Sequence, residues 1–246
     1  MGVKAVSDLS NSYQVAIVVA LEREVAPLIQ GWASTQKAFE GRSYTFFQSG
    51  TAVLVCAGIG AEAARRAAEA IIKLHNPALV ISAGFAGALD NMLVVGQIVI
   101  PTVVVDARDG SRTSCDGEAG TLVSFSEIAT AEQKTNLREA YGARAVDMEA
   151  AAVAHSAEVH GVKFLACKAI SDTSDSTLPP VARFVNREGK FDTVRFVGFL
   201  ALRPWLWFAV ARLAADSKKA AESLCQALTE LCTAQSRSPE LQAVHR

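Results

Sequence analysis

Short apolar runs alternate along this chain with longer segments of helical periodicity. The runs are rich in β-branched residues, as in strands buried on both faces. They span 15–21, 51–56, 78–83 and 162–170, and 95–105 forms a longer strand or a pair bent at Pro101. Helical spacing or composition marks 25–32, 64–72, 126–141 and 146–160. This alternation predicts one α/β domain with helices on both faces of a largely parallel sheet.

The same pattern sets the expected limits of the domain. Residues 1–13 form a polar lead-in, the domain covers 14–235, and 236–246 is a polar tail. The sequence GFAG at 84–87 is expected to end one strand, and the polar segment after Asp172 is expected to form a loop. The helices expected beyond that loop complete the same domain, because alone they could not enclose a core.

Charge and cysteine content narrow the function classes. The 246 residues carry 24 Lys and Arg against 25 Asp and Glu, so nucleic acid is not an expected partner. The five cysteines show no metal-ligand spacing, and His155 and His160 do not share a helical face. We therefore expect reduced thiols, a cytoplasmic chain and neither a metal nor another cofactor.

The most apolar stretch, 196–213, has Arg203 and a proline at its centre, which argues against a membrane-spanning helix. Its large side chains point around the whole circumference of any helix that it forms, so a second surface must cover it. A homodimer partner is the first expectation. The alternative is that Trp205, Trp207 and Phe208 border a pocket and meet a lipid-like substituent or a membrane surface.

Polar residues and glycines follow several of the predicted strands. In open parallel sheets, ligands bind beyond the carboxyl ends of the strands, where Glu22, Glu24, Gly84 and Asp172 all fall. Taken singly, each has a plainer explanation, because glycines permit tight turns and acids cap helices. On a helix Glu22 and Glu24 point about 200° apart, and neither lies on the apolar stripe, so periodicity does not choose between them.

The sequence AVDMEAAAVA at 145–154 places Glu149 in a helix of alanine, valine and methionine. A carboxylate in such surroundings is costly without a partner, and a capping role suits Asp147 better than Glu149. A vicinal diol could be that partner, because a carboxylate accepts two hydrogen bonds. The usual hydrolase, P-loop and dinucleotide motifs do not occur in the sequence.

Five motifs occur in a fixed order, namely LEREV at 21–25, AGIG at 57–60, SAGFAGAL at 82–89, VDMEAAAVA at 146–154 and CKAISDTSD at 167–175. Together they resemble the nucleoside phosphorylase superfamily, and within it the methylthioadenosine/S-adenosylhomocysteine nucleosidases and the hopanoid-associated phosphorylases. The resemblance implies a single three-layer α/β/α domain around a largely parallel, twisted mixed sheet. It also implies a homodimeric enzyme that cleaves the N-glycosidic bond of a purine nucleoside.

The resemblance assigns roles by position. Asp172 would be the general acid that protonates N7 of the purine, with Ser171 orienting its carboxyl group, and burial after an apolar strand would favour its protonated form. Glu24 would hold the attacking water, Glu149 would bind the ribose hydroxyls and Met148 would pack beneath the sugar. These roles suit a reaction in which the departing base is neutralised while the sugar becomes oxocarbenium-like.

Three positions depart from the nucleosidase pattern. Phe85 replaces a serine beside the ribose or the nucleophile, Lys168 replaces an arginine, and Ile128 stands near the place of an aromatic residue that stacks on the base. The sequence therefore leaves two candidates for the 5′ substituent of the nucleoside, namely that of methylthioadenosine and a lipid. Because only Arg23 and Lys168 are cationic around the expected pocket, water is the expected nucleophile. Phosphorolysis with inorganic phosphate and a catalytically silent nucleoside-binding module are the alternatives.

Overall fold

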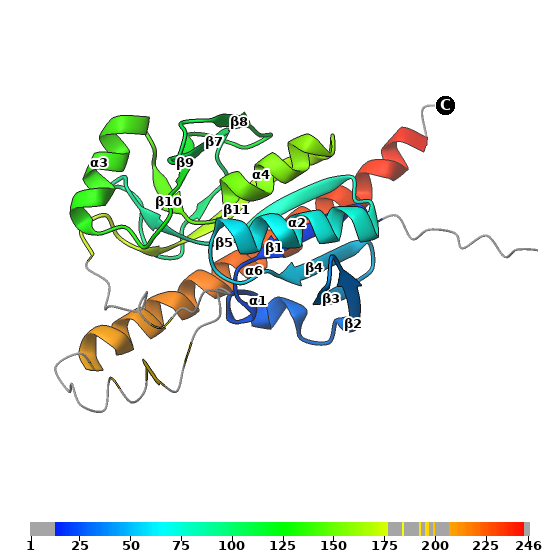
Figure 1. Cartoon of the computed structure of the whole chain (residues 1–246), viewed down its shortest axis with the longest axis horizontal. Helices are drawn as coiled ribbons and strands as arrows, with labels where there is room; N and C mark the ends of the chain where they lie inside the picture. The colour runs from blue at the N-terminus through cyan, green and yellow to red at the C-terminus, as the bar shows by residue number, and fades with distance from the viewer. Residues whose placement is uncertain are drawn as a thin grey trace, which may run out of the picture.

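Figure 1 shows the computed structural model of the chain, in which helices lie on both sides of a central sheet. The structure describes residues 13–176, Phe184, Asp192, 195–196, Phe199 and 207–243, with the side chains of the last helix described as far as 235. Its strands are β1 (Val15–Val19), β2 (Ala33–Phe39), β3 (Arg42–Ser49), β4 (Ala52–Cys56), β5 (Leu79–Ala88), β6 (Ile98–Val99), β7 (Val103–Asp106), β8 (Arg112–Ser114), β9 (Thr121–Ser124), β10 (Ala145–Asp147) and β11 (Lys163–Asp172). Its helices are α1 (Glu22–Ile29), α2 (Ala61–His75), α3 (Ala131–Tyr141), α4 (Ala150–Val159) and α6 (Trp207–Ala243).

Hydrophobic cores lie on the two faces of the sheet. On β1, Ala16 and Val18 belong to the core that contains α2 and α4, while Ile17 and Val19 belong to the core that contains α1 and α6. The two sets separate because successive side chains of a strand point to opposite sides. Burial on both faces is why the strands read as continuous apolar runs in the sequence. The predicted three-layer α/β/α class is confirmed.

Strand β5 lies at the centre of the sheet, whose order is β2-β3-β4-β1-β5-β10-β9-β7-β8, with β11 paired to β5 and β6. β1 runs parallel to β4 and β5, and β11 runs parallel to β5. Antiparallel pairs join β2 to β3, β3 to β4 and β10 to β5. The register shifts between Ile170 and Asp172, where the last residues of β11 lie beside Gly87 of β5. This pairing brings two of the five motifs side by side.

Some predicted boundaries are wrong. GFAG at 84–87 does not end its strand, because β10 and β11 supply partners along this segment and β5 continues to Ala88. The hairpin of β2 and β3 and the short strands β8 and β9 are not predicted from the sequence. Most of β2 is exposed, so it lacks the apolar run that marks a buried strand.

Helix α6 is one element of 37 residues that continues past the expected domain limit at 235. Its buried residues Ala220, Leu224 and Leu228 pack in the core with α1 and β11. Of the apolar stretch 196–213, the structure describes Phe196, Phe199 and 207–213, and the predictions for Arg203 and Trp205 lie outside the described residues. Among the helices that the structure describes, none is both long and apolar enough to cross a membrane.

Candidate active site

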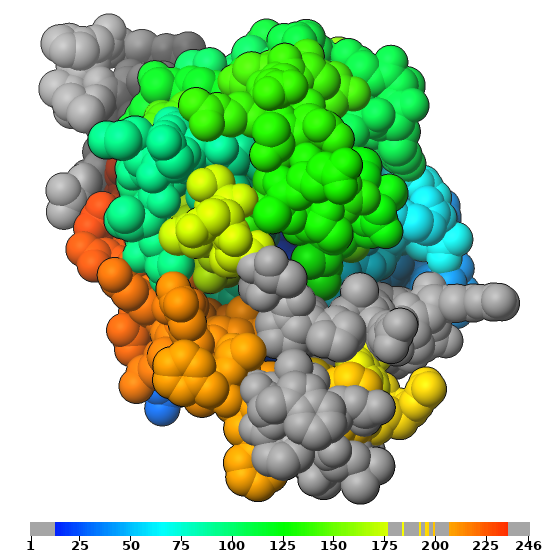
Figure 2. All heavy atoms as spheres, turned by 90° about the vertical axis from the view of Figure 1, so that its left-hand side faces the viewer, coloured from blue at the N-terminus to red at the C-terminus, as the bar shows by residue number. Residues whose placement is uncertain are grey.

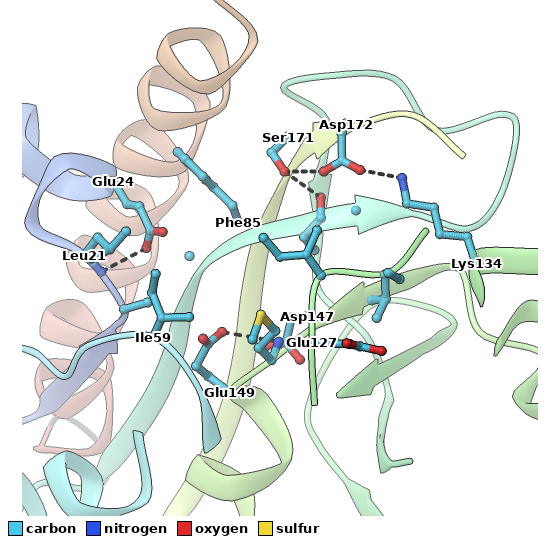
Figure 3. Close-up of a pocket in the computed structure, with 18 of the residues that line it drawn as sticks. Leu21, Glu24, Ile59, Phe85, Glu127, Lys134, Asp147, Glu149, Ser171 and Asp172 are labelled. Carbon is cyan, nitrogen blue, oxygen red and sulfur yellow. Dashed lines mark hydrogen bonds and ion pairs between the residues drawn. The ribbon is translucent and has the colours of Figure 1, made fainter. Parts of the chain in front are cut away.

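One cavity brings together most of the residues predicted for the site (Figure 3). Its lining includes Glu24, Gly84, Phe85, Ile128, Met148, Glu149, Ser171 and Asp172. It lies beyond the carboxyl ends of β1 and β11 and beside the second half of β5, the edge at which open parallel sheets bind ligands.

Glu24 enters this cavity from the first turn of α1. The backbone N–H of Leu21 donates to Glu24 Oε2 at 3.4 Å. Glu24 is 5% exposed, whereas Glu22 is exposed to solvent. The expectation that neither glutamate lies on the buried face is therefore wrong. The helix ends at Ile29, whereas the predicted apolar pattern continues to residue 32. Its buried residues are Glu24, Val25 and Ile29.

Glu149 reaches the cavity from the residue before α4, and not from within a helix as predicted. β10 occupies 145–147, and α4 begins at Ala150, whose N–H donates to Asp147 Oδ2 at 2.8 Å. Asp147 therefore accepts from the first residue of the helix, whose N-cap position is held by Glu149. The Glu149 carboxylate accepts instead from the backbone N–H of Gly60 at 2.8 Å and of Met148 at 3.3 Å. These two donors fix its orientation at the cavity.

Three carboxylates share one buried lysine beneath the cavity. Lys168 is not one of the residues that line the cavity, and its Nζ lies 2.8 Å from Asp147 Oδ2. Burial raises the pKa of Glu24 to about 7, with the negative charge of Glu149 adding to the rise and Lys168 opposing it. Burial likewise raises the pKa of Glu149 to about 7, with Asp147 adding and Lys168 opposing. Both glutamates can therefore change charge near neutral pH.

The same cluster keeps Lys168 charged. Burial alone would lower the pKa of this lysine, but Asp147, Glu149 and Glu24 together outweigh that effect and raise it. The positive charge of the ammonium group therefore interacts with the buried carboxylates of Asp147, Glu149 and Glu24. It lies beneath the cavity, where it balances their charge.

Asp172 lies at the end of β11, across the cavity from Glu24 (Figure 3). Ser171 Oγ donates to Asp172 Oδ1 at 2.7 Å, the contact expected of an orienting residue. Asp172 Oδ2 contacts Lys134 Nζ of α3, and this ammonium also donates to the carbonyl of Thr173 at 2.6 Å. Lys134 is not predicted from the sequence. The available signal is that it lies three residues before Leu137, on the buried face of α3.

Two glycines of β5 leave room for these charged groups. Gly84 has a φ of 141°, and a Cβ at this position would lie 3.1 Å from Glu24 Oε2. A Cβ at Gly87 would lie 3.0 Å from Asp172 Oδ2 and 3.3 Å from Lys134 Cε. Side chains at either position would therefore push on a carboxylate of the site.

The rest of the cavity wall is largely apolar and comes from Leu21, Ile59, Phe85, Ile128 and Met148. Apolar walls with a few fixed polar groups are typical of sites for small organic ligands. Within the described part of the chain, no group of three His, Cys, Asp or Glu side chains is placed to hold a metal ion.

A second cavity shares Ser171 and Asp172 with the first and lies between residues 173–176 and the beginning of α6. Figure 2 shows the segment after β11 at the surface, next to the first turns of α6. At this end of α6, Trp207 is 57% exposed and Phe208 is 80% exposed, and Phe208 lines the second cavity. The sequence suggests that Trp207 and Phe208 border a pocket. Of these two, Phe208 lines the second cavity.

The fold and the site define a class of protein, an α/β/α domain whose strand ends surround a carboxylate-rich pocket. The profile of the phosphorylase superfamily matches residues 14–128 and 117–191. The chain belongs to this superfamily. The family seen in the five motifs is therefore confirmed, and so is the prediction of an enzyme.

Individual relatives agree with this assignment. The chain is 28% identical over 158 residues to the 5′-methylthioadenosine/S-adenosylhomocysteine nucleosidase of Staphylococcus epidermidis. The aligned region covers 50% of this chain and 69% of that protein. The 5′-methylthioadenosine nucleosidase of Arabidopsis thaliana has a TM-score of 0.69 at 16% identity, covering 91% of this chain and 96% of that one. The futalosine hydrolase of Helicobacter pylori has a TM-score of 0.67 at 17% identity, covering 89% and 96%. These two structures share the fold of this chain.

Proposed function

We propose that this protein is a nucleosidase that hydrolyses the N-glycosidic bond of a 5′-substituted adenosine and releases adenine. The observation that carries the proposal is the distribution of carboxyl groups around one cavity, with Asp172 on one side and Glu24 and Glu149 across from it. This is the arrangement that a reaction with charge developing on both the base and the sugar requires. The names of the nucleosidase relatives support the same reaction.

Each carboxyl group has a task in the proposed mechanism. When the C1′–N9 bond breaks, its electron pair enters the purine, and Asp172 delivers a proton to N7 while Ser171 holds the carboxyl group in place. Glu149 accepts hydrogen bonds from the ribose hydroxyls, and Met148 packs beneath the sugar. Glu24 removes a proton from the water that attacks C1′, a role for which a pKa of about 7 is well matched.

The charges around the cavity support water as the nucleophile. Among the described residues that line it, the acidic ones are Glu24, Glu127, Asp147, Glu149 and Asp172, and the basic ones are Arg23 and Lys134. Lys134 contacts Asp172, and the nearby Lys168 contacts Asp147. A phosphate dianion needs several donors or positive charges, and here it would meet an excess of negative charge.

The 5′ substituent is the least constrained part of the proposal. The nucleosidases and the futalosine hydrolase share this fold, so the fold does not select among nucleosides. Phosphorolysis of an adenosine with a lipid-like 5′ group and ligand binding without catalysis are the alternatives. A homodimer, a cytoplasmic location and a lipid contact through 196–213 stay predictions.

The test is to incubate the purified protein with 5′-methylthioadenosine, S-adenosylhomocysteine, futalosine and an adenosine with a long alkyl 5′ group. Each reaction is run in ¹⁸O-labelled water with and without phosphate, and the base and the sugar product are identified by mass spectrometry. We expect free base and ¹⁸O on C1′ at an unchanged rate in phosphate. A ribose 1-phosphate derivative would establish phosphorolysis, and tight binding of every nucleoside without release of base would establish a binding module.

A further inference from the structure

Lys134 is a charged residue on the buried face of α3, and its side chain is 3% exposed. The ammonium group contacts Asp172 Oδ2, donates to the Thr173 carbonyl at 2.6 Å and lies 3.4 Å from Ser176 Oγ. Figure 3 shows this side chain reaching the carboxyl group from the side away from Glu24. A positive charge is therefore built into the surroundings of the proposed general acid.

This arrangement raises a chemical question about the acid. A lysine beside a carboxyl group favours the ionised carboxylate, which has no proton to give. A buried pair is also not needed for stability as such, because apolar residues of similar volume often stabilise a core as well or better. A carboxyl group with Ser171 alone would be the simpler donor. The lysine must therefore contribute something that the isolated acid lacks.

The second cavity offers a route between Lys134 and solvent. Ser176 lines that cavity and bridges Lys134 and Asp172, with its Oγ 3.4 Å from each of the two charged groups. The cavity also reaches Arg212 of α6, whose side chain is 72% exposed. Protons can thus return to Lys134 from the side of Asp172 that is turned away from the nucleoside.

We propose that Lys134 is a positioning residue that stores the proton which Asp172 passes to the leaving base; this inference rests on the proposed nucleosidase function. As the C1′–N9 bond breaks and its electron pair enters the purine, a proton moves from Lys134 Nζ to the Asp172 carboxylate and from Asp172 to N7. Asp172 ends as the carboxylate, and Lys134 ends as the neutral amine. Lys134 then regains a proton from water through Ser176.

The physical basis is the low polarity of the site. In water an ammonium–carboxylate pair is far more stable than the neutral amine–acid pair, but burial penalises the two charges and brings the two forms closer in free energy. The pair keeps one transferable proton at pH values where an isolated carboxyl group has none. Among the described residues, the charged groups that line the two cavities besides this pair include Glu127, Asp175, Arg212 and Asp216, and none of these four forms a hydrogen bond or ion pair with the Asp172 carboxylate.

The test compares the pH profile of kcat from pH 5 to 9 for the parent enzyme, Lys134→Met, Lys134→Arg and Asp172→Asn. Arg138→Met is the matched control, because Arg138 is an exposed cation on the same helix. We expect Lys134→Met to lose about 10²-fold in kcat at pH 8 but less than about tenfold at pH 5.5, where solvent supplies protons more readily. KM should change less than about threefold.

Two further comparisons separate storage of a proton from a structural role. Lys134→Arg keeps a positive charge but holds its protons too tightly to release them, so it should follow the Met variant at pH 8. The double variant Lys134→Met, Asp172→Asn should be no slower than Asp172→Asn alone, since the lysine acts through the acid. Thermal midpoints measured on all variants identify any loss that comes from unfolding.

Each outcome decides the inference. A Lys134→Met profile that is parallel to that of the parent, full activity in Lys134→Arg, or additive losses in the double variant would each overturn proton storage while leaving the nucleosidase intact. If the parent releases no base from any nucleoside, the proposed function fails first, and this inference is withdrawn with it.

Discussion

Lys168 Nζ lies 2.8 Å from Asp147 Oδ2, and the two side chains are 1% and 0% exposed beneath the cavity. The same lysine opposes the rise in pKa at both Glu24 and Glu149. Asp147 in turn is fixed by the N–H of Ala150 at the start of α4. The buried Lys168 ammonium, which is paired with Asp147, therefore lowers the pKa of both glutamates.

Replacing Lys168 by methionine removes that charge with little change in volume. The pKa values of Glu24 and Glu149 should then rise above 7, because the positive charge that opposes burial and repulsion at both groups is gone. If Glu24 acts as a base, turnover at pH 7 falls and recovers partly at pH 8 to 9. The pH dependence of kcat for the nucleoside that the parent cleaves measures this shift.

Lys163 provides the matched control, since it is an exposed lysine at the start of the same strand. Lys163→Met should leave the profile unchanged. An ascending limb of kcat that keeps the parent's midpoint in Lys168→Met would show that this lysine does not tune the glutamates.

Glu24 and Glu22 allow the proposed base to be tested within one turn of α1. Glu24→Gln removes the group that takes the proton from water, and turnover should fall by about 10²-fold or more. Glu22 is exposed, so Glu22→Gln should keep the activity of the parent. In the parent, kcat should rise with pH through about 7, because Glu24 acts as a base only when it is ionised. Equal rates in the two variants would exclude Glu24 from the mechanism.

Asp172→Asn tests the general acid. The amide keeps the size of the side chain but has no acidic proton, so turnover should fall by about 10²-fold or more while nucleoside binding is retained. Binding is measured by calorimetry with a nucleoside that the variant does not cleave during the titration. Turnover within a few fold of the parent would remove Asp172 from the mechanism.

The sequence predicts the parts of this fold that depend on interactions between residues close together in the chain. The apolar runs of β1, β4, β5 and β11 are buried on both faces, and Gly142 ends α3 in the left-handed conformation, near the predicted position. β2 cannot be found in this way, because it is exposed and held by its pairing with β3. The site residues come from motif order, which places Glu24, Glu149 and Asp172 on one cavity.

What cannot be predicted is which distant groups meet. Lys134 and Asp172 are 38 residues apart and contact each other only because β11 and α3 converge on β10 and β5. A lysine in a helix of polar composition is usually a surface residue, and the position of Lys134 three residues before the buried Leu137 is the weak sequence signal to the contrary. The prediction of Glu149 within a helix is wrong for a similar reason, because the three-residue strand before α4 is too short to show a period.

The raised pKa of Glu24 also predicts a stability cost. Its folded-state value of about 7 lies above 4.5, so the native state binds more protons than the unfolded state between these values. Stability from this group is present below about pH 4.5 and is lost as pH rises through about 7. Glu24→Gln mimics the protonated form and should raise the free energy of unfolding at pH 8 by up to ~3 kcal/mol, with little change at pH 5. Urea titrations at both pH values measure the difference.

The opposite sign is expected at His75, which lies at the end of α2 against the rings of Tyr13 and Phe46. Burial, with a smaller effect of Lys37, lowers its pKa from 6.5 to about 4, and its buried Nε2 has no hydrogen-bond partner among the described residues. The unfolded state therefore binds more protons between pH 6.5 and 4, and stability falls as pH decreases through this window.

Replacing His75 by phenylalanine keeps the aromatic packing and removes this titration. The parent should lose up to ~3 kcal/mol of unfolding free energy from this group between pH 6.5 and 4, and His75→Phe should lose less by that amount. His155→Gln, at an exposed histidine of α4, is the control and should follow the parent. Because the cavity lies at the other end of β1 from Tyr13, kcat at pH 7 should be unchanged in both variants. Parallel stability curves for the parent and His75→Phe would show that His75 binds its proton equally well in the folded and the unfolded protein.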